Sequence, residues 1–317
     1  MINVVLCKEI KGACEEAQKL GNVCAVEVEY GDEELSPENC DAVILALNHH
    51  GPRANNTPPS EAPLIPEAKK FLDEENYFDN FIVSHIDADT ILGIMWMSGI
   101  MKNTEIAMEI SKIVSEVDIK GFHYYEENLH NNLPDYIKYR YLAIGQLISK
   151  TKFEDNSKNT VDVSRIVHKL ILKVKDIIVE GPSQEKINSI NNWLETKHEV
   201  AKQALVTNIP GVMNVYKSDI FLNNAYCLEP GNCVDIIVQY NTGNFSIVIS
   251  AKDEEIAQRY FGENGVIEPL KKFFGDKAGG RKGIGGSPRD HKYKPEILES
   301  FVSFLNREYI NLPQLKI

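Results

Sequence analysis

The sequence contains no run of about 18 apolar residues, the length that a membrane-spanning helix needs. Its N-terminal stretch lacks the basic start, apolar middle and small-residue cleavage site of a signal peptide. The 6 cysteines are scattered without a CxxC pair, so we expect reduced, mostly buried thiols and no cysteine metal site. These absences predict a soluble cytoplasmic protein without a membrane partner.

The sequence also contains fewer basic than acidic residues. Lys and Arg total 34 against 46 Asp and Glu, which gives a formal net charge of -12. A field of this sign repels polyanions, so we expect no tight binding of long nucleic acid. A local basic patch can still hold a small anionic substrate, although the charge can equally serve solubility alone.

No internal repeat of fixed period occurs, and the P-loop pattern GxxxxGK[ST] is absent. What is present is an ordinary globular composition, with 43% hydrophobic and 25% charged residues. A chain of 317 residues is long enough for two hydrophobic cores. We therefore predict two domains.

The hydrophobic patterning divides the chain into three parts. Residues 1–155 alternate short apolar strands, polar loops and helices, which predicts a mostly parallel sheet with flanking helices. Residues 156–208 show apolar spacing of three and four, which predicts a helical connector. Residues 209–317 contain alternating β-branched strands and a final helix, which predicts a smaller α+β domain. The fold class is therefore α/β.

A His/Asp triplet follows one of the apolar strands. If the strand continued through the triplet, His85, Asp87 and Asp89 would share one face. Two nearby carboxylates and an imidazole repel or lose solvation unless a cation neutralises them, so this pattern predicts a divalent-metal site. The alternative is a helix cap, since Asp89 is a good N-cap residue before Thr90.

Asp118 and His123 are the next candidate ligands. They lie after a helix, around a glycine that permits a tight turn. Together with the triplet they would complete a shell of carboxylates and imidazoles, which suits manganese, iron, cobalt or zinc. A lone Asp and a lone His in a loop are alternatively ordinary surface residues.

Adjacent histidines end another apolar strand, at His49 and His50. Adjacent residues of a strand face opposite ways, so one of the two at most reaches a shared metal. Either can instead act as a general acid or donate to phosphate, with the Arg53 guanidinium beside it. Polar residues at strand ends are where open α/β sheets bind ligands.

A glycine-rich basic segment lies near the end of the chain. Glycines let backbone amides approach an anion closely, and the neighbouring arginines and lysine add positive charge. The alternative is a flexible surface loop without a ligand. The predicted substrate-binding residues, including the arginine of the preceding paragraph, are Arg53, Gly279, Gly280, Arg281, Gly285, Gly286 and Arg289.

With this triplet, a two-domain layout and a late glycine-rich segment, the chain resembles the DHH phosphoesterase superfamily. His85, Asp87 and Asp89 match the first metal motif of that family, and the C-terminal part is similar to its associated glycine-loop domain, with Arg281 where a His is more usual. The chain departs from the family in its Asp-His-His motif, because the adjacent histidines follow Asn48 and precede the triplet.

The resemblance implies a metal-dependent phosphoesterase that binds Mn²⁺ at His85, Asp87, Asp89, Asp118 and His123. Its substrate would be a small phosphate ester or anhydride, such as a short oligonucleotide or a nucleotide-like molecule, in a cleft between the domains. Predicted catalytic residues are His49, His50 and Asp87, and a homodimer is compatible with this reading.

The absence of the Asp-His-His motif supports an alternative. In this alternative the metal site is degenerate, and the protein is a non-catalytic phosphate-ligand binding or regulatory protein. A purely structural subunit would leave both the triplet and the glycine-rich segment unexplained.

Overall fold

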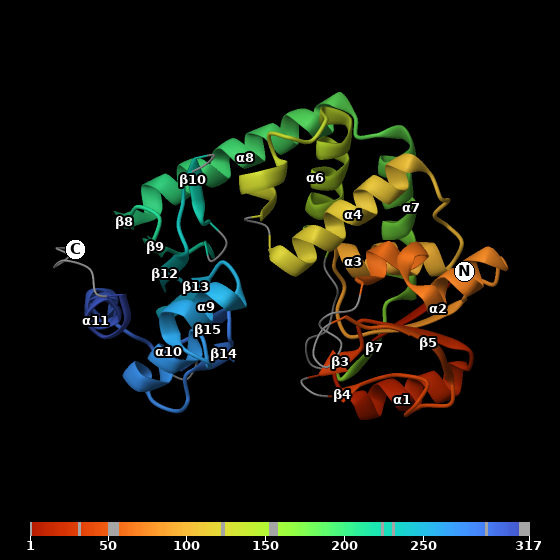
Figure 1. Ribbon diagram of the computed structural model, residues 1–317, viewed down its shortest axis with the longest axis horizontal. Coiled ribbons are helices and arrows are strands. Elements are labelled where there is room, and N and C mark those ends of the chain that lie inside the picture. Colours follow the sequence, from red (N-terminus) through yellow and green to blue (C-terminus); the bar gives the residue numbers. More distant parts are fainter. Residues whose placement is uncertain are drawn as a thin grey trace. The chain divides into compact units, whose positions relative to one another are not determined.

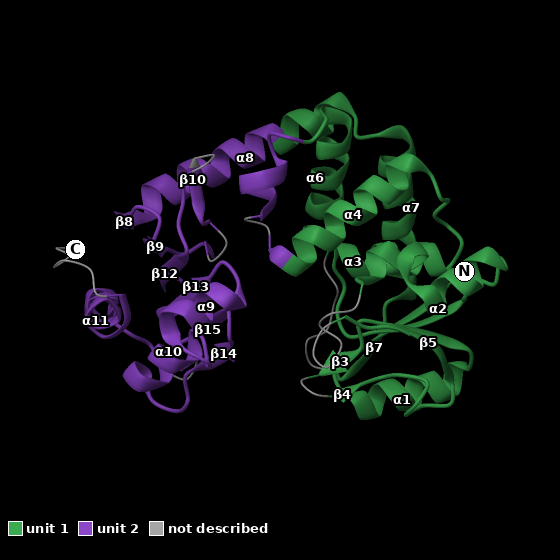
Figure 2. Ribbon diagram, viewed as in Figure 1, with its two compact units in different colours: residues 1–119, 133–190 green, residues 120–132, 191–317 purple. Residues whose placement is uncertain are grey.

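The computed structural model describes residues 2–30, 33–49, 57–121, 124–151, 158–222, 225–229, 232–288 and 291–310. The chain forms two compact units (Figure 2). Unit 1 comprises residues 1–119 and 133–190, and unit 2 comprises residues 120–132 and 191–317. The predicted two-domain α/β fold is confirmed. Residues 156–208, predicted as a connector, are divided between the two units.

Unit 1 is built on a five-stranded sheet with the order β5-β2-β6-β1-β7, and it also contains a short hairpin of β3 and β4. The first four strands of the sheet are parallel, and β7 is antiparallel to β1. All four residues of β2 are buried, as expected for a parallel strand covered by helices on both faces. The strands of unit 1 are β1 (Asn3–Cys7), β2 (Val23–Val26), β3 (Glu29–Tyr30), β4 (Glu33–Glu34), β5 (Val43–Leu47), β6 (Asn80–Val83) and β7 (Thr160–Asp162).

Helices cover both faces of this sheet, with α1 on one face and α3 and α7 on the other (Figure 1). Helix α4 belongs to unit 1 apart from Lys120, and α8 spans the boundary between the units. The helices are α1 (Ile10–Leu20), η2 (Pro59–Leu64), α2 (Pro66–Asp73), α3 (Ala88–Met97), α4 (Glu105–Lys120), α6 (Asp135–Ser149), α7 (Ser164–Glu180) and α8 (Gln184–Ala204).

In two of these helices, the positions of the apolar residues in the sequence match the residues that are buried. In α1 the buried Ala13 and Ala17 are four residues apart, and the helix ends where Gly21, at φ 66°, donates its N–H to the Ala17 carbonyl. Every residue of α3 except the first is buried, which matches the apolar sequence TILGIMWM. A helix buried on all sides fixes the positions of the residues at its N-terminus, and these include Asp87 and Asp89.

Unit 2 is built on a six-stranded sheet with the order β14-β15-β13-β12-β9-β8. Strands β9 and β12 are parallel, and all the other neighbouring pairs are antiparallel. A two-stranded hairpin, β10 and β11, lies apart from this sheet. The strands are β8 (Leu205–Ile209), β9 (Met213–Ser218), β10 (Cys227–Glu229), β11 (Asn232–Cys233), β12 (Ile236–Asn241), β13 (Ser246–Ala251), β14 (Gly279–Arg281) and β15 (Ile284–Gly286).

The main core of unit 2 forms between this sheet and the C-terminal helices, with Phe261, Leu270 and Phe301 all buried in it. A second cluster packs around Tyr216 on β9 and Ala201 on α8. The helices of unit 2 are η3 (Tyr125–Leu129), α9 (Glu254–Phe261), α10 (Ile267–Phe274), α11 (Glu296–Leu305) and η4 (Asn306–Ile310).

In unit 2, the glycine-rich segment is not the flexible surface loop of the alternative interpretation, because Gly279–Arg281 and Ile284–Gly286 pair as an antiparallel hairpin at the sheet edge. One expectation was wrong in this unit. The cysteines are not all reduced, because Cys227 and Cys233, paired across β10 and β11, form a disulfide. Sequence separation alone does not reveal such a cross-strand pair, since it depends on the hairpin register.

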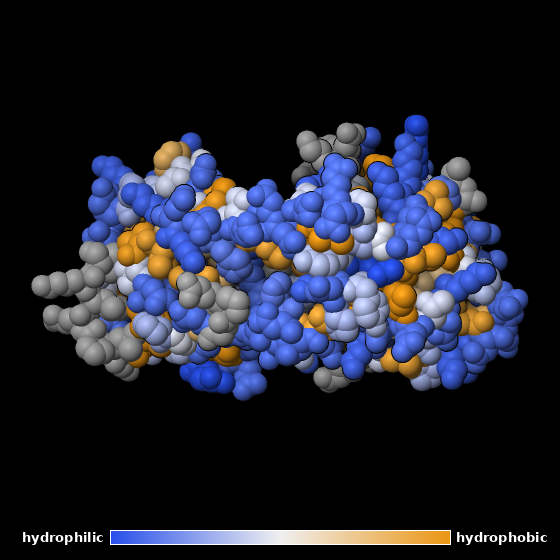
Figure 3. Space-filling view, turned by 90° about the horizontal axis from the view of Figure 1, so that it is seen from above, coloured by the Kyte–Doolittle hydropathy of each residue, from blue (hydrophilic) through white to orange (hydrophobic). Residues whose placement is uncertain are grey.

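On the face shown in Figure 3, most of the surface is hydrophilic, and hydrophobic side chains are scattered in small patches. None of the helices in the described parts of the chain combines the length and apolar character needed to cross a membrane.

Candidate metal centre

Three neighbouring strands of the unit 1 sheet, β5, β2 and β6, end at the same edge. Glu27 follows β2 directly, His49 lies two residues beyond the end of β5, and His85 lies two residues beyond the end of β6. The carboxyl ends of parallel strands are where open α/β sheets bind ligands. Here that edge gathers two imidazoles and a carboxylate from three separate loops.

Three carboxylate side chains form a buried group around the imidazole of His49. The His49 Nε2 atom lies 2.8 Å from Glu27 Oε1, 3.1 Å from Asp118 Oδ2 and 3.7 Å from Asp89 Oδ2. The side chains of Glu27 and Asp89 are fully excluded from solvent, that of His49 is 2% exposed and that of Asp118 is 19% exposed. Three carboxylates in a space this dry repel one another unless positive charge lies among them.

A second, outer group lies around His85. Its Nε2 atom is 3.3 Å from Glu27 Oε2 and 3.3 Å from Asp87 Oδ2. The side chains of His85 and Asp87 are 45% and 39% exposed. This group is therefore accessible to water and small solutes, in contrast to the buried group.

Glu27 belongs to both groups, and it presents a different carboxylate oxygen to each. Oε1 faces His49, while Oε2 faces His85 and also accepts a hydrogen bond of 2.7 Å from the Thr90 hydroxyl. All ligand atoms of each group lie within 4.8 Å of one another, and both groups could hold a metal ion. The arrangement is that of a carboxylate able to bridge two cations.

The backbone at Glu27 adopts an unusual conformation that its neighbours hold in place. Glu27 has φ 54°, a left-handed conformation that costs a non-glycine residue about 1–3 kcal/mol and is concentrated at functional sites. Its N–H donates to the Leu47 carbonyl at 3.0 Å, and its carbonyl accepts from the Ser84 hydroxyl. The ends of both neighbouring strands therefore hold Glu27 in place.

Asp87 and Asp89 lie at the start of α3. The expectation that the triplet continues a strand was wrong, because β6 ends at Val83. Asp87 is the N-cap of α3 and accepts from the Thr90 N–H at 2.9 Å, so the capping role falls on Asp87 and not on Asp89. The Oδ1 atom of Asp89 accepts from the Ser60 N–H at 2.9 Å, while its buried Oδ2 accepts no hydrogen bond from the described residues.

Asp118 lies within the last turn of α4, and the expectation that it follows the helix was wrong. The C-terminus of a helix carries partial negative charge, so a carboxylate there is unfavourable without a nearby cation. The helix nevertheless brings this carboxylate to the imidazole of His49. A bound cation would remove that electrostatic cost.

Asn48, which stands before the histidine pair, has a structural role. Its Oδ1 accepts from the Val28 N–H at 3.1 Å, and its Nδ2 donates to the Leu35 carbonyl at 3.1 Å and to Glu34 Oε2 at 3.4 Å. The side chain is buried and connects the end of β5 to the segment that follows Glu27. An aspartate would lack the two N–H donors that these contacts use.

The ionisation of the centre reflects its excess of carboxylates. Burial by itself lowers the pKa of His49, but the hydrogen bonds to Asp118 and Glu27 outweigh it and raise the pKa to about 10. Burial also lowers the pKa of His85, but the hydrogen bonds to Asp87 and Glu27 outweigh this effect and raise the pKa to about 10. Burial, and then the charge of Glu27, raise the pKa of Asp89 well above its ordinary value. Without metal, protons supply the positive charge that the centre needs.

The spacing of the donor atoms fits metal coordination. Ligand atoms bound to one ion at about 2.1 Å lie about 3.0 Å apart at octahedral angles and about 3.4 Å apart at tetrahedral angles. The 3.1 Å separation of His49 and Asp118 and the two 3.3 Å separations of the outer group lie in this range, whereas the 2.8 Å and 3.7 Å separations of the buried group lie just below and just above it. Among these donor atoms, Asp89 Oδ2 accepts no hydrogen bond from the described residues and is therefore available to an ion.

The structure therefore brings together His49, His85, Asp87, Asp89 and Asp118 of the predicted site residues. The other predicted residues of this region, His50, Arg53 and His123, lie outside the described residues.

Glu27 was missed by the sequence analysis although it is common to both groups. The sequence analysis considered polar residues only at the ends of the strands before the histidine pair and before the triplet, and it assigned no role to the glutamate that follows the apolar run Val23–Val26. The available signal was a carboxylate directly after four apolar residues, at a strand end comparable to those before His49 and His85.

The glycine hairpin of unit 2 borders a depression of about 1090 Å³. Gly279, Gly280, Gly285 and Gly286 line it together with Arg281. Basic groups also come from the lysine at position 277 and the histidine at position 291, so the depression suits an anion. The predicted Arg289 lies outside the described residues.

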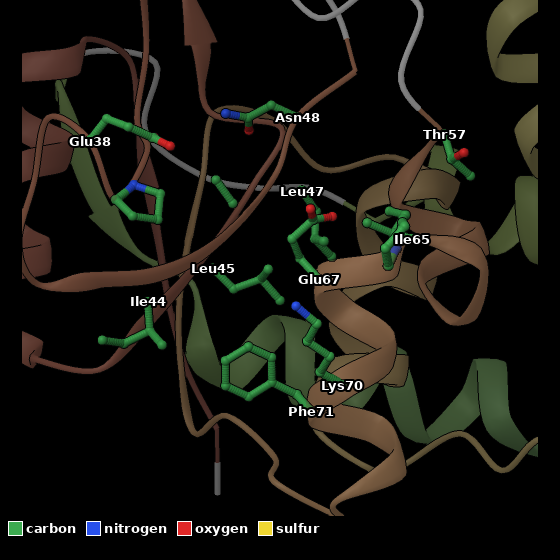
Figure 4. Close-up of a pocket in the computed structure, with 13 residues that line it drawn as sticks. Glu38, Ile44, Leu45, Leu47, Asn48, Thr57, Ile65, Glu67, Lys70 and Phe71 are labelled. Atoms are coloured by element: carbon green, nitrogen blue, oxygen red, sulfur yellow. The ribbon is translucent and has the colours of Figure 1, made fainter.

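Another pocket, of about 620 Å³, lies along β5 and α2 (Figure 4). Its lining is mixed, with Leu45 and Phe71 beside Lys70 and the carboxylates of Glu38 and Glu67. Neither carboxylate belongs to a ligand group and the lining has no histidine. The chemistry of unit 1 is therefore concentrated at the strand ends and not in this pocket.

No protein-family model matches the chain, and no curated protein matches it significantly. Among solved structures, the chain is similar to the crystal structure of an uncharacterized protein from Helicobacter pylori G27, with 13% sequence identity over 96% of this chain and 90% of that chain. The TM-score is 0.21, so this likeness carries no argument about fold or function. Any functional inference therefore depends on the residues of the centre.

Proposed function

We propose that this protein is a metal-dependent phosphoesterase that hydrolyses a small phosphate ester or anhydride, such as a short oligonucleotide or a nucleotide-like molecule. The observation that carries the proposal is the position of Glu27, whose two carboxylate oxygens face two separate ligand groups. Paired metal ions about 3.5–4 Å apart are characteristic of phosphatases and nucleases. A bridging carboxylate is suited to hold two ions at such a separation.

Mn²⁺ is the metal we propose. The buried group offers three carboxylates and one imidazole, and the outer group offers two carboxylates and one imidazole. Carboxylate-rich sites with some imidazole favour manganese over softer ions. When bound, such ions supply a water of lowered pKa and neutralise charge on phosphoryl oxygens.

The two groups would have different roles because their exposure differs. His49, at 2% exposure and enclosed by carboxylates, is suited to ligation and is too buried to reach a substrate. Asp87, at 39% exposure, can contact both a ligand ion and an incoming molecule. We therefore retain Asp87 as the residue that meets the reacting phosphate or water, and we assign His49 to metal binding.

Substrate recognition would use the depression beside the glycine hairpin. Its exposed backbone and the Arg281 guanidinium are suited to the anionic part of a substrate. The resemblance to DHH phosphoesterases supports separate residues for metal binding and for substrate recognition. The chain departs from that family at Asn48, whose side chain forms structural hydrogen bonds.

Metal content and hydrolysis, measured together, test the proposal. Purified wild type, Glu27→Gln and Asp87→Asn would be dialysed against Mn²⁺, analysed for bound metal and assayed with bis(p-nitrophenyl) phosphate. Asp79→Asn is a matched control, because Asp79 is an exposed carboxylate at the opposite end of β6. We expect the wild type and the control to bind metal and hydrolyse the diester, and both site variants to lose turnover.

A wild type that binds metal stoichiometrically but hydrolyses neither this diester nor short oligonucleotides would instead favour the phosphate-ligand binding protein. A wild type without bound metal after dialysis would reject the metal centre itself. The two failures are therefore distinguishable.

A further inference from the structure

Two cysteines of unit 1 lie unusually close together. Cys14 belongs to α1, Cys40 lies in the turn before β5, and their Sγ atoms are 2.8 Å apart. Non-bonded carbon atoms prefer separations of about 3.5–4.0 Å, and sulfur is larger than carbon. A disulfide bond requires about 2.0 Å. The two sulfur atoms are therefore already closer than an ordinary non-bonded contact.

The surroundings hold both residues at this position. Cys40 is 3% exposed and belongs to the hydrophobic cluster that also contains Ala13 and Ala17 of α1. Its N–H donates to the Ser36 carbonyl at 3.0 Å, and its carbonyl accepts from the Val43 N–H at 2.9 Å. Closing the bond therefore needs a small adjustment of two side chains and leaves the fold unchanged.

Access for an oxidant comes from the Cys14 side. Cys14 is half-buried, whereas Cys40 is buried beneath it. Cys7 and Cys24 are fully buried and contact no other sulfur atom within the described part of the chain. The remaining two cysteines already form the disulfide of unit 2. The Cys14 and Cys40 thiols are thus the pair placed for further oxidation.

We propose that Cys14 and Cys40 are a site of reversible covalent modification, at which a low-molecular-weight disulfide oxidises the two thiols to an intramolecular disulfide. The Cys14 thiolate attacks the small disulfide, forming a mixed disulfide and releasing one small thiolate. The Cys40 thiolate then attacks the Cys14 sulfur, forming the protein disulfide and releasing the second small thiolate. The protein loses two electrons and the small disulfide gains them.

The bond would close a loop that contains part of the metal centre. Residues 14 to 40 include β2 and Glu27, together with the β3–β4 hairpin. Cross-linking α1 to the turn before β5 would restrict the opening of this segment. The proposal concerns the thiols alone and does not depend on the phosphoesterase activity.

Thiol mapping of the full-length wild type in glutathione buffers tests the proposal. After equilibration with excess glutathione disulfide, free thiols are alkylated under denaturing conditions, and the digest is analysed by mass spectrometry. We expect a cross-linked peptide that contains Cys14 and Cys40, with Cys7 and Cys24 recovered in the alkylated form. The contact with Cys40, and then burial, raise the pKa of Cys14 to about 11. Because the thiolate is the attacking species, the rate at which the cross-link forms should rise about tenfold per pH unit between pH 7 and 9.

The variant Cys40→Ser should trap Cys14 as its mixed disulfide with glutathione, and Cys24→Ala is the matched control that should still form the cross-link. If Cys40→Ser does not fold, the thiol mapping of the wild type tests the proposal without this variant. Recovery of both Cys14 and Cys40 as alkylated free thiols in oxidising buffer, or a cross-link of Cys14 to another cysteine, would overturn the proposal.

Discussion

The Oε1 atom of Glu27 lies 2.8 Å from the Nε2 atom of His49, with both side chains excluded from solvent. The other oxygen of the same carboxylate faces His85 in the more exposed outer group. Glu27 is thus the residue through which the buried group and the outer group are physically coupled. Its replacement should affect both groups, whereas replacement of Asp87 should affect only one.

This coupling predicts different metal stoichiometries for two isosteric variants. Glu27→Gln removes the negative charge shared by both groups, so we expect both ions to bind at least about 100-fold more weakly. Asp87→Asn removes a ligand of the outer group only, so one ion should remain. Equilibrium dialysis against Mn²⁺ followed by elemental analysis measures both. Equal metal content in Glu27→Gln and wild type would show that Glu27 does not bridge.

The stability of the metal-free protein should decrease as the pH rises. The pKa of His49 is 6.5 in an unfolded chain and about 10 in the fold. A group whose pKa is raised by folding contributes stability that is complete below the unfolded value and disappears as the pH rises through the folded value. Urea unfolding in EDTA should therefore show falling stability between about pH 6.5 and pH 10.

The raised pKa of Asp89 acts in the same direction, because its folded carboxyl also holds a proton more tightly than the unfolded one. His49→Gln should show a shallower decline over the same pH range. Metal ions compete with these protons, so the affinity for metal should instead increase with pH. Constant stability from pH 6.5 to 10 in EDTA would contradict the ionisation described for the centre.

Asn48→Asp should destabilise the protein without adding a metal ligand. The aspartate cannot donate to the Leu35 carbonyl and places a second carboxylate near Glu34. Leaving a buried acceptor unpaired costs about 1–3 kcal/mol, and charge repulsion adds to this. Denaturant unfolding with EDTA and metal analysis without it are the two measurements. A variant of unchanged stability with increased metal content would mean that position 48 faces the ions.

Two neighbouring glycines of the unit 2 hairpin should respond differently to alanine. A Cβ atom at Gly280, which has φ 151°, would lie 2.3 Å from the Ile284 carbonyl oxygen, whereas one at Gly279 would meet nothing within 4 Å. We expect Gly280→Ala to destabilise the hairpin by about 1–3 kcal/mol and Gly279→Ala to be nearly neutral. Hydrogen exchange of the β14 and β15 amides measures this difference. Equal protection in both variants would exclude a backbone requirement at Gly280.

Much of the fold followed from local pattern. Apolar runs before the histidine pair and before the triplet predicted β5 and β6, and apolar spacing of three and four in residues 156–208 predicted the helices that the structure shows as α7 and α8. Both signals are local, because the faces of a strand or helix are set by residues a few positions apart. That the triplet could hold a metal ion was likewise visible. The end of β6 at Val83 was not visible, since it depends on the neighbouring strands.

The sequence by itself determined the two-domain α/β class, several of the strands and helices, and most of the ligand types. Tertiary structure decided which residues meet. The strand order β5-β2-β6 places Glu27 between histidines that are distant in sequence, and helix packing brings Asp118 to the same place. The register of a hairpin pairs Cys227 with Cys233, and packing of α1 on the sheet brings Cys14 to Cys40. Such contacts depend on the order and packing of elements, which no local pattern of side chains specifies.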